Sequence, residues 1–317
     1  MRSLRLNFIY WLWLVAMGWA WMTRYLALVT TAFASVLISP ALAEKASEYF
    51  SDYAAYTEKG QSFLDKIEPV TGLVELPNGV NLDLKDKFYF VNSEDARAIL
   101  TEAWGNPPDA ATQAAGMIFP GKASPLADTW GIELRPDLIG YINDEDAASI
   151  DYNDLLASMK SDTLAGNEER TKAGYEPVTL VGWAQAPRYD AENKRLYWAK
   201  ELKFGNAERH ALNYDVRFLN REGALVMSYI ASMDQLPEVN GSLTDVLNAV
   251  SFDPGKRYSD YVPGADKVAA IGVGGLIAGK VVAKTGLLVV ALAFLKKFGV
   301  LLFLPVVWIW RRIRGAA

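Results

Sequence analysis

The sequence predicts an α+β fold with antiparallel sheets and segregated helices, followed by a C-terminal transmembrane helix. Between Val178 and Ile230, apolar and polar residues alternate in four segments joined by short turns, as they do in antiparallel strands. Segments with helical spacing flank this region instead of alternating with it. Residues 268–310 are almost continuously apolar, and a water-soluble domain of ordinary size cannot bury such a stretch.

Residues 1–43 are expected to be an upstream extension followed by a secretory signal peptide. Residues 22–43 begin with a basic residue, continue with a short apolar core and end with a small-x-small cleavage sequence at Ala41–Ala43, which is the order found in signal peptides. Residues 1–21 contain four tryptophans and form the extension. The alternative for the first part is an uncleaved membrane span from Leu6 to Trp21.

Residues 268–317 are expected to form a membrane anchor with a basic cytoplasmic tail. We expect the span to run from Val268 to Leu295, because a crossing helix needs about 20 apolar residues and this choice puts Lys296 and Lys297 at the membrane boundary. An alternative span over residues 285–310 would place both lysines near its middle, at a cost of roughly 2.5–3.5 kcal/mol each. With either span, the C-terminal arginines belong on the cytoplasmic side.

A stripe of small residues lies in this segment and consists of Gly272, Gly275 and Gly279. Such stripes let transmembrane helices approach closely, so the segment is a candidate for association into a homo-oligomer. The alternative is that these glycines have no role in association, because small residues are common in membrane spans.

Charge and cysteine content restrict the function of the remaining part. Residues 1–43 carry three basic residues and residues 268–317 carry seven, with no acid in either, so residues 44–267 hold 22 basic and 37 acidic residues, a net charge of −15. A domain this acidic repels nucleic acid, which is excluded as a partner. The absence of cysteine excludes disulfides and cysteine-ligated zinc.

Residues 44–175 are expected to form an N-terminal α+β subdomain. The pair Asn78-Gly79 between two alternating segments predicts a β-hairpin. The elements expected are, in chain order, an amphipathic helix at 44–69, the hairpin at 74–84, a strand at 87–91, a helix capped by Ser93 that ends at Trp104, strands at 117–119 and 129–134, and a helix through Ile150, Leu155 and Met159. The polar residues 168–176 are expected to form a loop or a frayed helix, and they are the best candidate for the subdomain boundary.

Residues 176–267 are expected to form an antiparallel four-strand meander with a covering helix and a tether. The strands expected are 178–183, 195–204, 211–219 and 224–230. A helix that starts at Pro237 presents an apolar stripe able to cover one face of the sheet. Residues 251–266, which contain several Gly, Pro and Tyr residues, lead from this helix into the expected anchor.

The region around the first turn of the meander is the candidate binding surface. It concentrates Trp, Tyr and Arg residues, which dominate the energetics of binding interfaces. The alternative is that the tryptophans belong to the core and the charges form cross-strand pairs. The candidate residues are Trp183, Arg188, Tyr189, Asp190, Trp198, Lys200 and Glu201.

Patterns for catalysis or metal binding are weak. His210 is the single histidine, and no G-x-S-x-G sequence supplies a serine partner for a catalytic triad. Asp144 and Asp146 are a weak candidate for a Ca²⁺ site, but the glycine that an EF-hand loop requires is missing, and capping of a helix explains the same acids. No cofactor is expected, since the sequence has no phosphate-binding G-x-x-x-x-G-K loop.

Six segments occur in a specific order: Trp104–Pro108, Gly116–Pro120, Gly140–Ala147, Leu180–Ala184, Tyr197–Leu202 and Met233–Pro237. Together they resemble a bacterial family of uncharacterised membrane-anchored proteins, defined by a domain of unknown function. The resemblance implies a signal peptide, an extracytoplasmic α+β domain and a C-terminal membrane anchor, and it brings no catalytic residues. At fold level, four strands followed by a covering helix are similar to the photosystem oxygen-evolving P-subunit type of α/β/α domain, a non-enzymatic binding module.

These observations predict a membrane-anchored extracytoplasmic protein of the bacterial inner (cytoplasmic) membrane, with its main domain in the periplasm. The expected role is a non-enzymatic binding or scaffolding module of the cell envelope, with the membrane and an envelope protein as partners. One alternative is an envelope hydrolase that uses paired carboxylates from Asp144, Asp146, Asp190 and Glu201. The other is a component of an oligomeric membrane pore.

Overall fold

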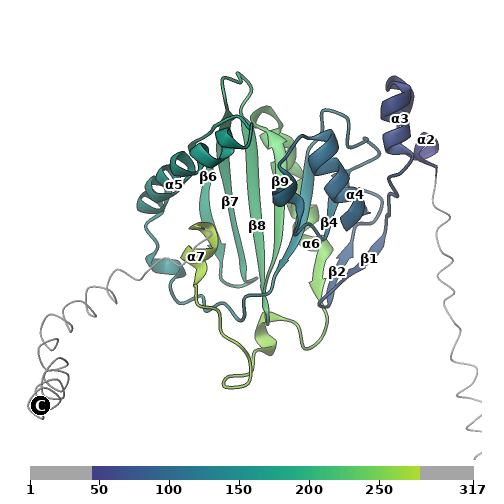
Figure 1. Cartoon of the computed structure of the whole chain (residues 1–317). Helices are drawn as coiled ribbons and strands as arrows, with labels where there is room; N and C mark the ends of the chain where they lie inside the picture. The colour runs from purple at the N-terminus through teal and green to yellow at the C-terminus, as the bar shows by residue number, and fades with distance from the viewer. Residues whose placement is uncertain (1–44, 279–317) are drawn as a thin grey trace, which may run out of the picture. The chain divides into compact units, whose positions relative to one another are not determined.

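The structure, a computed structural model, describes residues 45–278, which form two antiparallel sheets and surrounding helices (Figure 1). The larger sheet has seven strands in the order β3-β4-β5-β9-β8-β7-β6. They are β3 (Phe88–Asn92), β4 (Gly116–Pro120), β5 (Gly131–Asp137), β6 (Val178–Asp190), β7 (Arg195–Phe204), β8 (Ala211–Asn220) and β9 (Gly223–Ser232). The predicted α+β class with antiparallel sheets is confirmed for these residues.

The four-strand meander is confirmed, and β7, β8 and β9 have nearly the expected bounds. β6 is longer than expected, because it continues to Asp190. Its pairing with β7 shifts register at three places, the first of them between Leu180 and Gly182. Each such irregularity offsets the two-residue alternation of side chains, so the sequence pattern identifies β6 only near its start.

β5 joins the two expected subdomains within one sheet. It pairs with β9 along its whole length, from Gly131 opposite Ile230 to Asp137 opposite Ala224. Segment 44–175 therefore contributes β3, β4 and β5 to the larger sheet, and segment 176–267 contributes the other four strands.

The predicted hairpin is confirmed and belongs to the smaller sheet. It consists of β1 (Leu73–Leu76) and β2 (Val80–Asp83), and β10 (Val250–Phe252) pairs with the other edge of β2. Asn78 and Gly79 have φ angles of 66° and 70°. A two-residue turn with positive φ at both positions matches the twist of paired strands, and Asn-Gly is the pair that most readily adopts it.

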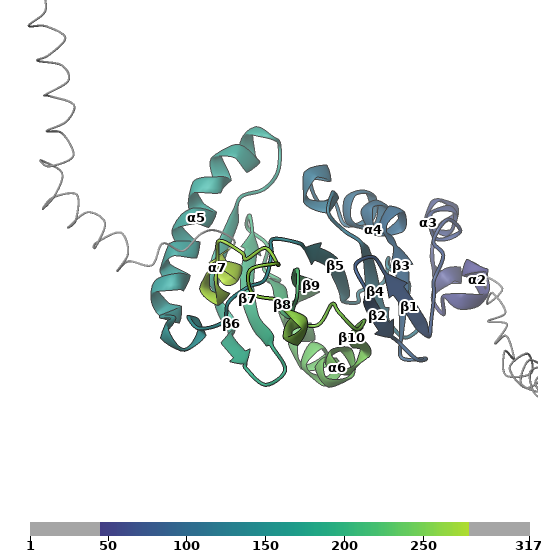
Figure 2. The ribbon, with the colours of Figure 1, turned by 90° about the horizontal axis from the view of Figure 1, so that it is seen from below.

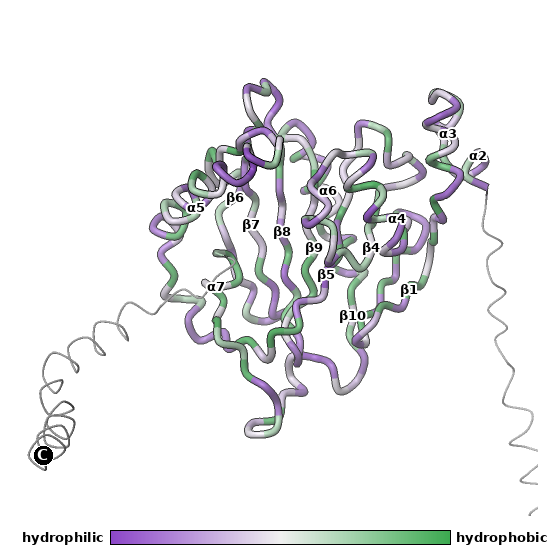
Figure 3. Tube along the Cα trace, in the orientation of Figure 1, coloured by the Kyte–Doolittle hydropathy of each residue, from purple (hydrophilic) through white to green (hydrophobic). Residues whose placement is uncertain are grey.

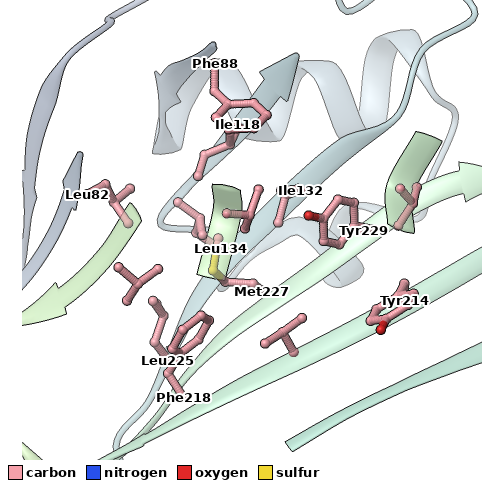
Figure 4. Packing of buried hydrophobic residues seen from close by; sticks show 14 of the residues in the cluster. Leu82, Phe88, Ile118, Ile132, Leu134, Tyr214, Phe218, Leu225, Met227 and Tyr229 are labelled. Atoms are coloured by element: carbon pink, nitrogen blue, oxygen red, sulfur yellow. The ribbon is translucent and has the colours of Figure 1, made fainter. Parts of the chain in front are cut away.

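One face of the larger sheet packs against the smaller sheet and α6 (Leu236–Ala249) around a broad apolar cluster (Figure 4). Tyr214, Val216 and Phe218 alternate along β8 and are at most 3% exposed. Figure 4 shows Tyr214 and Phe218 of β8 in one apolar layer with Met227 of β9. The covering helix expected at Pro237 is confirmed and begins one residue earlier.

The other face of the larger sheet is covered at its two ends by different helices (Figure 2). Over β3 and β4 lie α2 (Ala46–Tyr49), α3 (Glu58–Leu64), α4 (Ser93–Ala98) and a π-helical turn (Ile99–Ala103). Over β6 and β7 lie α5 (Tyr152–Lys172) and α7 (Val273–Ala278). Short 3₁₀ turns connect the remaining elements at Tyr53–Ala55, Pro108–Ala111, Ala147–Ser149, Met233–Gln235 and Tyr258–Asp260.

The expected helix over residues 44–69 is wrong as a single element, since the chain forms α2, a 3₁₀ turn and α3 there. The carboxylate of Asp52 accepts hydrogen bonds from the backbone N (3.0 Å) and the hydroxyl (2.8 Å) of Ser124. The side chain of Thr57 then caps α3. Side-chain bonds of this kind compete with helix continuation, so the contact with Ser124 divides the segment.

The expected cap of the following helix is also wrong by one residue. Asn92, not Ser93, accepts hydrogen bonds from the backbone N of Glu94 (2.8 Å) and of Asp95 (3.0 Å). Asparagine is as good a cap as serine, so the sequence offers two adjacent candidates and the end of β3 decides between them.

The boundaries of α5 differ more strongly from the expectation. Asp151 caps the helix, which begins at Tyr152, so the acids from Asp144 to Asp146 are not in its first turn. The helix continues to Lys172 through most of the expected loop 168–176. Polar residues do not end a helix by themselves. Lys172 and Glu168 form an exposed ion pair at 2.6 Å, with the four-residue spacing that supports a helix.

Residues 268–278 of the expected anchor lie in the described part of the chain and pack on the sheet. Val268 forms a parallel bridge with Tyr141, and Val273, Leu276 and Ile277 of α7 are buried beneath α5. No helix within residues 45–278 is long and apolar enough to cross a membrane. The expected signal peptide and the rest of the expected anchor lie outside the described residues.

Candidate functional site

The middle of the helix-covered face of the larger sheet carries charged side chains. They share this face because side chains alternate along a strand and point the same way at paired positions. Glu133 of β5 is paired with Ser228 of β9, which is paired with Asp215 of β8, and Figure 3 shows hydrophilic residues recurring along β8. We define the charged row as Glu133, Arg135, Lys200, Asp215 and Arg217.

Asp215 is the central anion of the charged row. Its side chain is 6% exposed, and Oδ2 lies 3.1 Å from Nζ of Lys200. Oδ1 accepts a hydrogen bond of 2.6 Å from the hydroxyl of Ser228. Burial alone would raise the pKa of Asp215, but the charges of Lys200 and Arg217 and the bond from Ser228 hold this pKa below its usual value. Asp215 is therefore an ionised carboxylate at neutral pH.

Arg217 is buried with much of its hydrogen-bonding capacity unused. The residue is 9% exposed, and its Nη2 lies 3.9 Å from Oδ1 of Asp215, which is too far for a hydrogen bond. Nε and Nη1 have no hydrogen-bond partner within residues 45–278. Nε1 of Trp198, whose ring lies 5.4 Å from the guanidinium, also lacks a partner there. Burial lowers the pKa of Arg217 and Asp215 opposes this change, but a guanidinium stays protonated in proteins.

Glu133 and Arg135 form the β5 end of the charged row. Nη1 of Arg135 donates a hydrogen bond of 2.9 Å to Oε1 of Gln113. Burial raises the pKa of Glu133, Arg135 partly opposes this, and Asp215 adds a smaller increase. The row therefore combines three cations with one firmly ionised carboxylate and one carboxylate whose ionisation is disfavoured.

We expect Glu133→Gln to stabilise the protein at neutral pH and to do so less in acid. Because the pKa of Glu133 is raised in the folded state, ionisation opposes folding once the pH exceeds the carboxyl group's unfolded pKa. This penalty is absent when the group is protonated in both states, near pH 4 or below. Thermal unfolding midpoints of the full chain between about pH 4 and pH 8 measure the difference. The exposed Glu168→Gln is the control, and a gain independent of pH would contradict the prediction.

Our sequence interpretation did not single out most of the charged row. The available signal is a polar residue at every second position of β5 and of β8. Such a series predicts one polar face, and a polar face of an antiparallel sheet is usually in contact with water. The burial of Asp215 and Arg217 arises from helices that lie on both sides of the row, and these helices come from distant parts of the chain.

Three residues of the predicted binding surface lie on the face of the charged row. Lys200 is itself a member of the row, and Trp183 is its paired residue on β6. Trp198 is 1% exposed, and Trp183 donates from Nε1 to the carbonyl of Tyr152 at 3.3 Å. Trp198 is therefore a core residue beside the charged row, and Trp183 attaches β6 to the start of α5.

Two other predicted surface residues lie on the opposite face of the sheet. Nη2 of Arg188 donates to the hydroxyl of Tyr197 at 2.9 Å, and its guanidinium lies 4.6 Å from the centre of the same ring. Oε1 of Glu201 lies 2.5 Å from Nδ1 of His210. The structure thus divides the predicted binding surface between two faces, because neighbouring residues of a strand point in opposite directions.

Of the remaining two members, Tyr189 bonds to Asp144, one of the two weak metal candidates. The carboxylate of Asp144 accepts hydrogen bonds from the hydroxyls of Tyr189 (2.6 Å) and Tyr258 (3.0 Å), and Nζ of Lys194 lies 2.7 Å away. Burial tends to raise the pKa of Asp144, but Lys194 and the two tyrosines hold it below the usual value. Its oxygens are thus used within the protein, where they fix three elements to one another.

Asp146 and Asp190 have local structural contacts. Asp146 accepts from the backbone N of Val273 (2.9 Å) and of Gly274 (3.2 Å), at the start of α7. Asp190 accepts from Asn193 within its own turn. Within residues 45–278, no group of three or more acidic or histidine side chains is arranged to hold a metal ion. The hydrolase alternative requires paired carboxylates from Asp144, Asp146, Asp190 and Glu201. Within residues 45–278, each of these four carboxylates has its own hydrogen-bonding partners and shares none of them with the other three.

Two glycines of the predicted association stripe are described by the structure, and Gly279 lies outside the described residues. A Cβ atom at Gly272 would lie 2.5 Å from the carboxylate oxygens of Asp146. Gly275 is buried within α7. Both glycines therefore pack against their own domain in this structure.

The described part of the chain is thus an α+β domain with a charged row on one face of a seven-stranded sheet, in which Asp215 and Arg217 are buried. The chain belongs to the family DUF2167, described as a protein of unknown function, whose model matches residues 68–307. The predicted membership of an uncharacterised family is confirmed, whereas the signal peptide and the membrane anchor stay predictions.

Beyond its family, the chain is similar in structure to solved proteins. No curated protein matches the chain. Among solved structures, the solution structure of cyanobacterial PsbP (CyanoP) from Synechocystis matches with 11% sequence identity and a TM-score of 0.32, over 59% of this chain and 92% of that chain.

Proposed function

We propose that the protein is a non-enzymatic binding domain held at the inner membrane of a bacterial cell envelope, and that its charged row binds a carboxylate group of the ligand. The observation that carries this proposal is Arg217. Its side chain is nine-tenths buried, while two of its nitrogens have no hydrogen-bond partner within residues 45–278.

An unpaired buried guanidinium is unfavourable and therefore informative. Leaving a buried donor without a partner costs about 1–3 kcal/mol, and more when the group is charged. Buried polar groups in native proteins are nearly always hydrogen-bonded, so an exception requires a specific reason. Nε and Nη1 lie on different edges of the guanidinium, so a carboxylate can accept from either of them together with Nη2, in the two-bond geometry that arginine favours. Nε1 of Trp198 is a further unused donor beside it.

The charges around Arg217 also favour an anion. Asp215 is shared between Arg217 and Lys200, so it neutralises one of these two cations but not both. Arg135 adds a further positive charge, and burial of Glu133 raises its pKa, which disfavours its negative form. A bound carboxylate would therefore reduce the excess positive charge of the row.

Replacing Arg217 with glutamine is expected to weaken the binding of acetate, used as a probe, by roughly tenfold or more. A hydrogen bond to a charged group contributes about 1.5–3 kcal/mol, and 1.4 kcal/mol corresponds to a tenfold change in affinity. The measurement is the rise in the thermal unfolding midpoint of the full chain with acetate concentration, at constant ionic strength, since a ligand of the native state stabilises it.

Arg97→Gln, an exposed substitution on α4, is the matched control and should keep the effect of acetate. The Arg217→Gln variant is expected to fold, because Lys200 and Ser228 still hold Asp215. Acetate that fails to stabilise the wild-type chain, or that stabilises both arginine variants equally, would contradict the proposed site.

Residues 268–278 pack on the sheet, so the expected span from Val268 to Leu295 cannot begin at Val268. The membrane attachment is supported by the apolar sequence that follows them, residues 279–310, and by the arginines after it. Reporter fusions after Gly264, Lys297 and Ala317 test this part of the proposal separately. We expect activity of an extracytoplasmic reporter after Gly264, and of a cytoplasmic reporter after the other two positions. A cytoplasmic position for Gly264 would contradict the attachment.

A further inference from the structure

A pocket lies at the end of the larger sheet where β7 begins and β8 ends, beside the 3₁₀ turn at Tyr258–Asp260. Its volume is about 480 Å³, which lies within the ~300–1,000 Å³ of typical small-molecule sites. None of the residues that line it belongs to the charged row. Its aromatic lining consists of Tyr141, Phe218, Phe252, Tyr258 and Tyr261.

The tyrosines of this pocket are held in fixed positions. Tyr141 and Tyr261 are stacked with ring centroids 3.8 Å apart and planes inclined by 12°. The ring centroid of Tyr258 lies 4.5 Å from that of Tyr141, and its one hydroxyl proton is shared between the carbonyl of Ile142 at 2.8 Å and the carboxylate of Asp144 at 3.0 Å. Aromatic walls that are already ordered offer contact area to a ring of the ligand with little further loss of side-chain entropy.

The charged residues that line the pocket are mainly basic. Lys194, Arg195 and Arg257 contribute three positive charges, and Glu192 contributes one carboxylate. Lys194 is paired with Asp144 at 2.7 Å, so its charge is already compensated. The two arginines then outnumber Glu192, so the lining keeps an excess of positive charge, which favours an anion.

Both arginines keep hydrogen-bond donors for a ligand. The guanidinium of Arg195 lies 5.2 Å from the ring centre of Phe218, and Nε of Arg257 donates a long bond of 3.5 Å to the carbonyl of Phe252. Neither guanidinium lies within 4.0 Å of a carboxylate oxygen in the ion pairs of residues 45–278, but Arg195 is the cross-strand neighbour of Asp190 and interacts with its charge. Each guanidinium has five N–H donors, so most of them remain for an anionic group.

We infer that this pocket binds a small anion that carries a flat ring, with the ring against the tyrosines and the anionic group bonded to Arg195 and Arg257. A bare anion would use the arginines and leave the aromatic walls uncovered. A neutral ring would cover the walls and leave both guanidinium groups without an anion. The inference is independent of the proposed function at Arg217, since the two sites share no residue.

The test is a calorimetric titration of the full chain, purified in mild detergent, with four probes. Phenyl phosphate and benzoate combine a ring with an anion, inorganic phosphate supplies the anion alone, and phenol supplies the ring alone. We expect at least one of the combined probes to bind roughly tenfold or more tightly than either partial probe. The stronger of the two combined probes identifies the anionic group as phosphate or carboxylate.

Arg195→Gln and Arg257→Gln are each expected to weaken the combined probe by roughly tenfold. Tyr141→Leu should weaken it as well and leave inorganic phosphate unchanged, which separates the ring contact from the charge. Arg97→Gln, an exposed substitution on α4, is the control and should leave binding unchanged. Absence of saturable binding below about 10 mM, or binding that none of the three pocket variants alters, would overturn the inference.

Discussion

Asp215→Ala is expected to lower the free energy of unfolding by about 3–5 kcal/mol, because it removes one partner from a buried ion pair. Nζ of Lys200 lies 3.1 Å from this carboxylate, and Arg217, which is 9% exposed, lies on its other side. Both cations have already lost much of their hydration in the folded state, so the lost attraction is not replaced by water. The thermal unfolding midpoint of the full chain should fall by roughly 2–4 °C for each kcal/mol.

Two variants distinguish this explanation from a general loss of packing. Asp215→Val combined with Arg217→Leu removes both buried charges and should cost less than Asp215→Ala alone, since apolar side chains often replace a buried pair without loss. Lys200, with 24% of its side chain exposed, can then extend towards water. Glu168→Ala breaks an exposed pair and should cost less than about 1 kcal/mol. If Asp215→Ala costs no more than Glu168→Ala, the row is hydrated and its proposed burial is wrong.

The strands of the meander could be predicted because their signal is local. Tyr214, Val216 and Phe218 alternate with polar residues over one strand length, and the short turns on either side require antiparallel neighbours. The pairing of β5 with β9 could not be predicted in the same way. Two strands from distant parts of the chain carry compatible patterns in several registers, and the periodicity of one strand does not select its neighbour.

The helices were harder to predict because their ends depend on individual contacts. The amphipathic pattern of residues 44–69 correctly indicated a buried face, and Tyr49 is 5% exposed. The division of that segment depends on the bonds between Asp52 and Ser124, which a helical period does not contain. In α5, by contrast, the polar composition of residues 168–176 indicated that the helix ends or frays before them, whereas α5 continues to Lys172.

The residues of the candidate site could likewise be predicted only in part, because the sequence does not show which of them share a face of the sheet. The sequence drew attention to Trp198 and Lys200 through their residue types, and both lie beside Arg217 and Asp215 in the structure. Arg188 was grouped with them because it is near in sequence, but it points to the other face. A set of residues chosen by spacing along two strands includes both faces unless the register shifts of β6 are known.

Gly223→Ala is expected to destabilise the protein by about 3 kcal/mol or more, since it combines backbone strain with a steric clash. Gly223 begins β9 with a φ of 148°, a conformation that residues with a side chain rarely adopt. An added Cβ would also overlap with the backbone carbonyl of Asp137, the last residue of β5. The carbonyl cannot rotate away freely, because the pair of Asp137 and Ala224 is the end of the ladder that joins the two halves of the sheet.

Gly166→Ala is the matched control for this prediction. Gly166 lies within α5, is exposed, and has no heavy atom within 4 Å of an added Cβ. Alanine is favoured over glycine in a helix by about 1 kcal/mol, so this substitution should raise the thermal unfolding midpoint of the full chain while Gly223→Ala lowers it. Opposite signs for the same chemical change would show that the close approach of β9 to the end of β5 stabilises the sheet. A neutral Gly223→Ala would mean that the two strands do not approach as closely as the pairing of Asp137 with Ala224 requires.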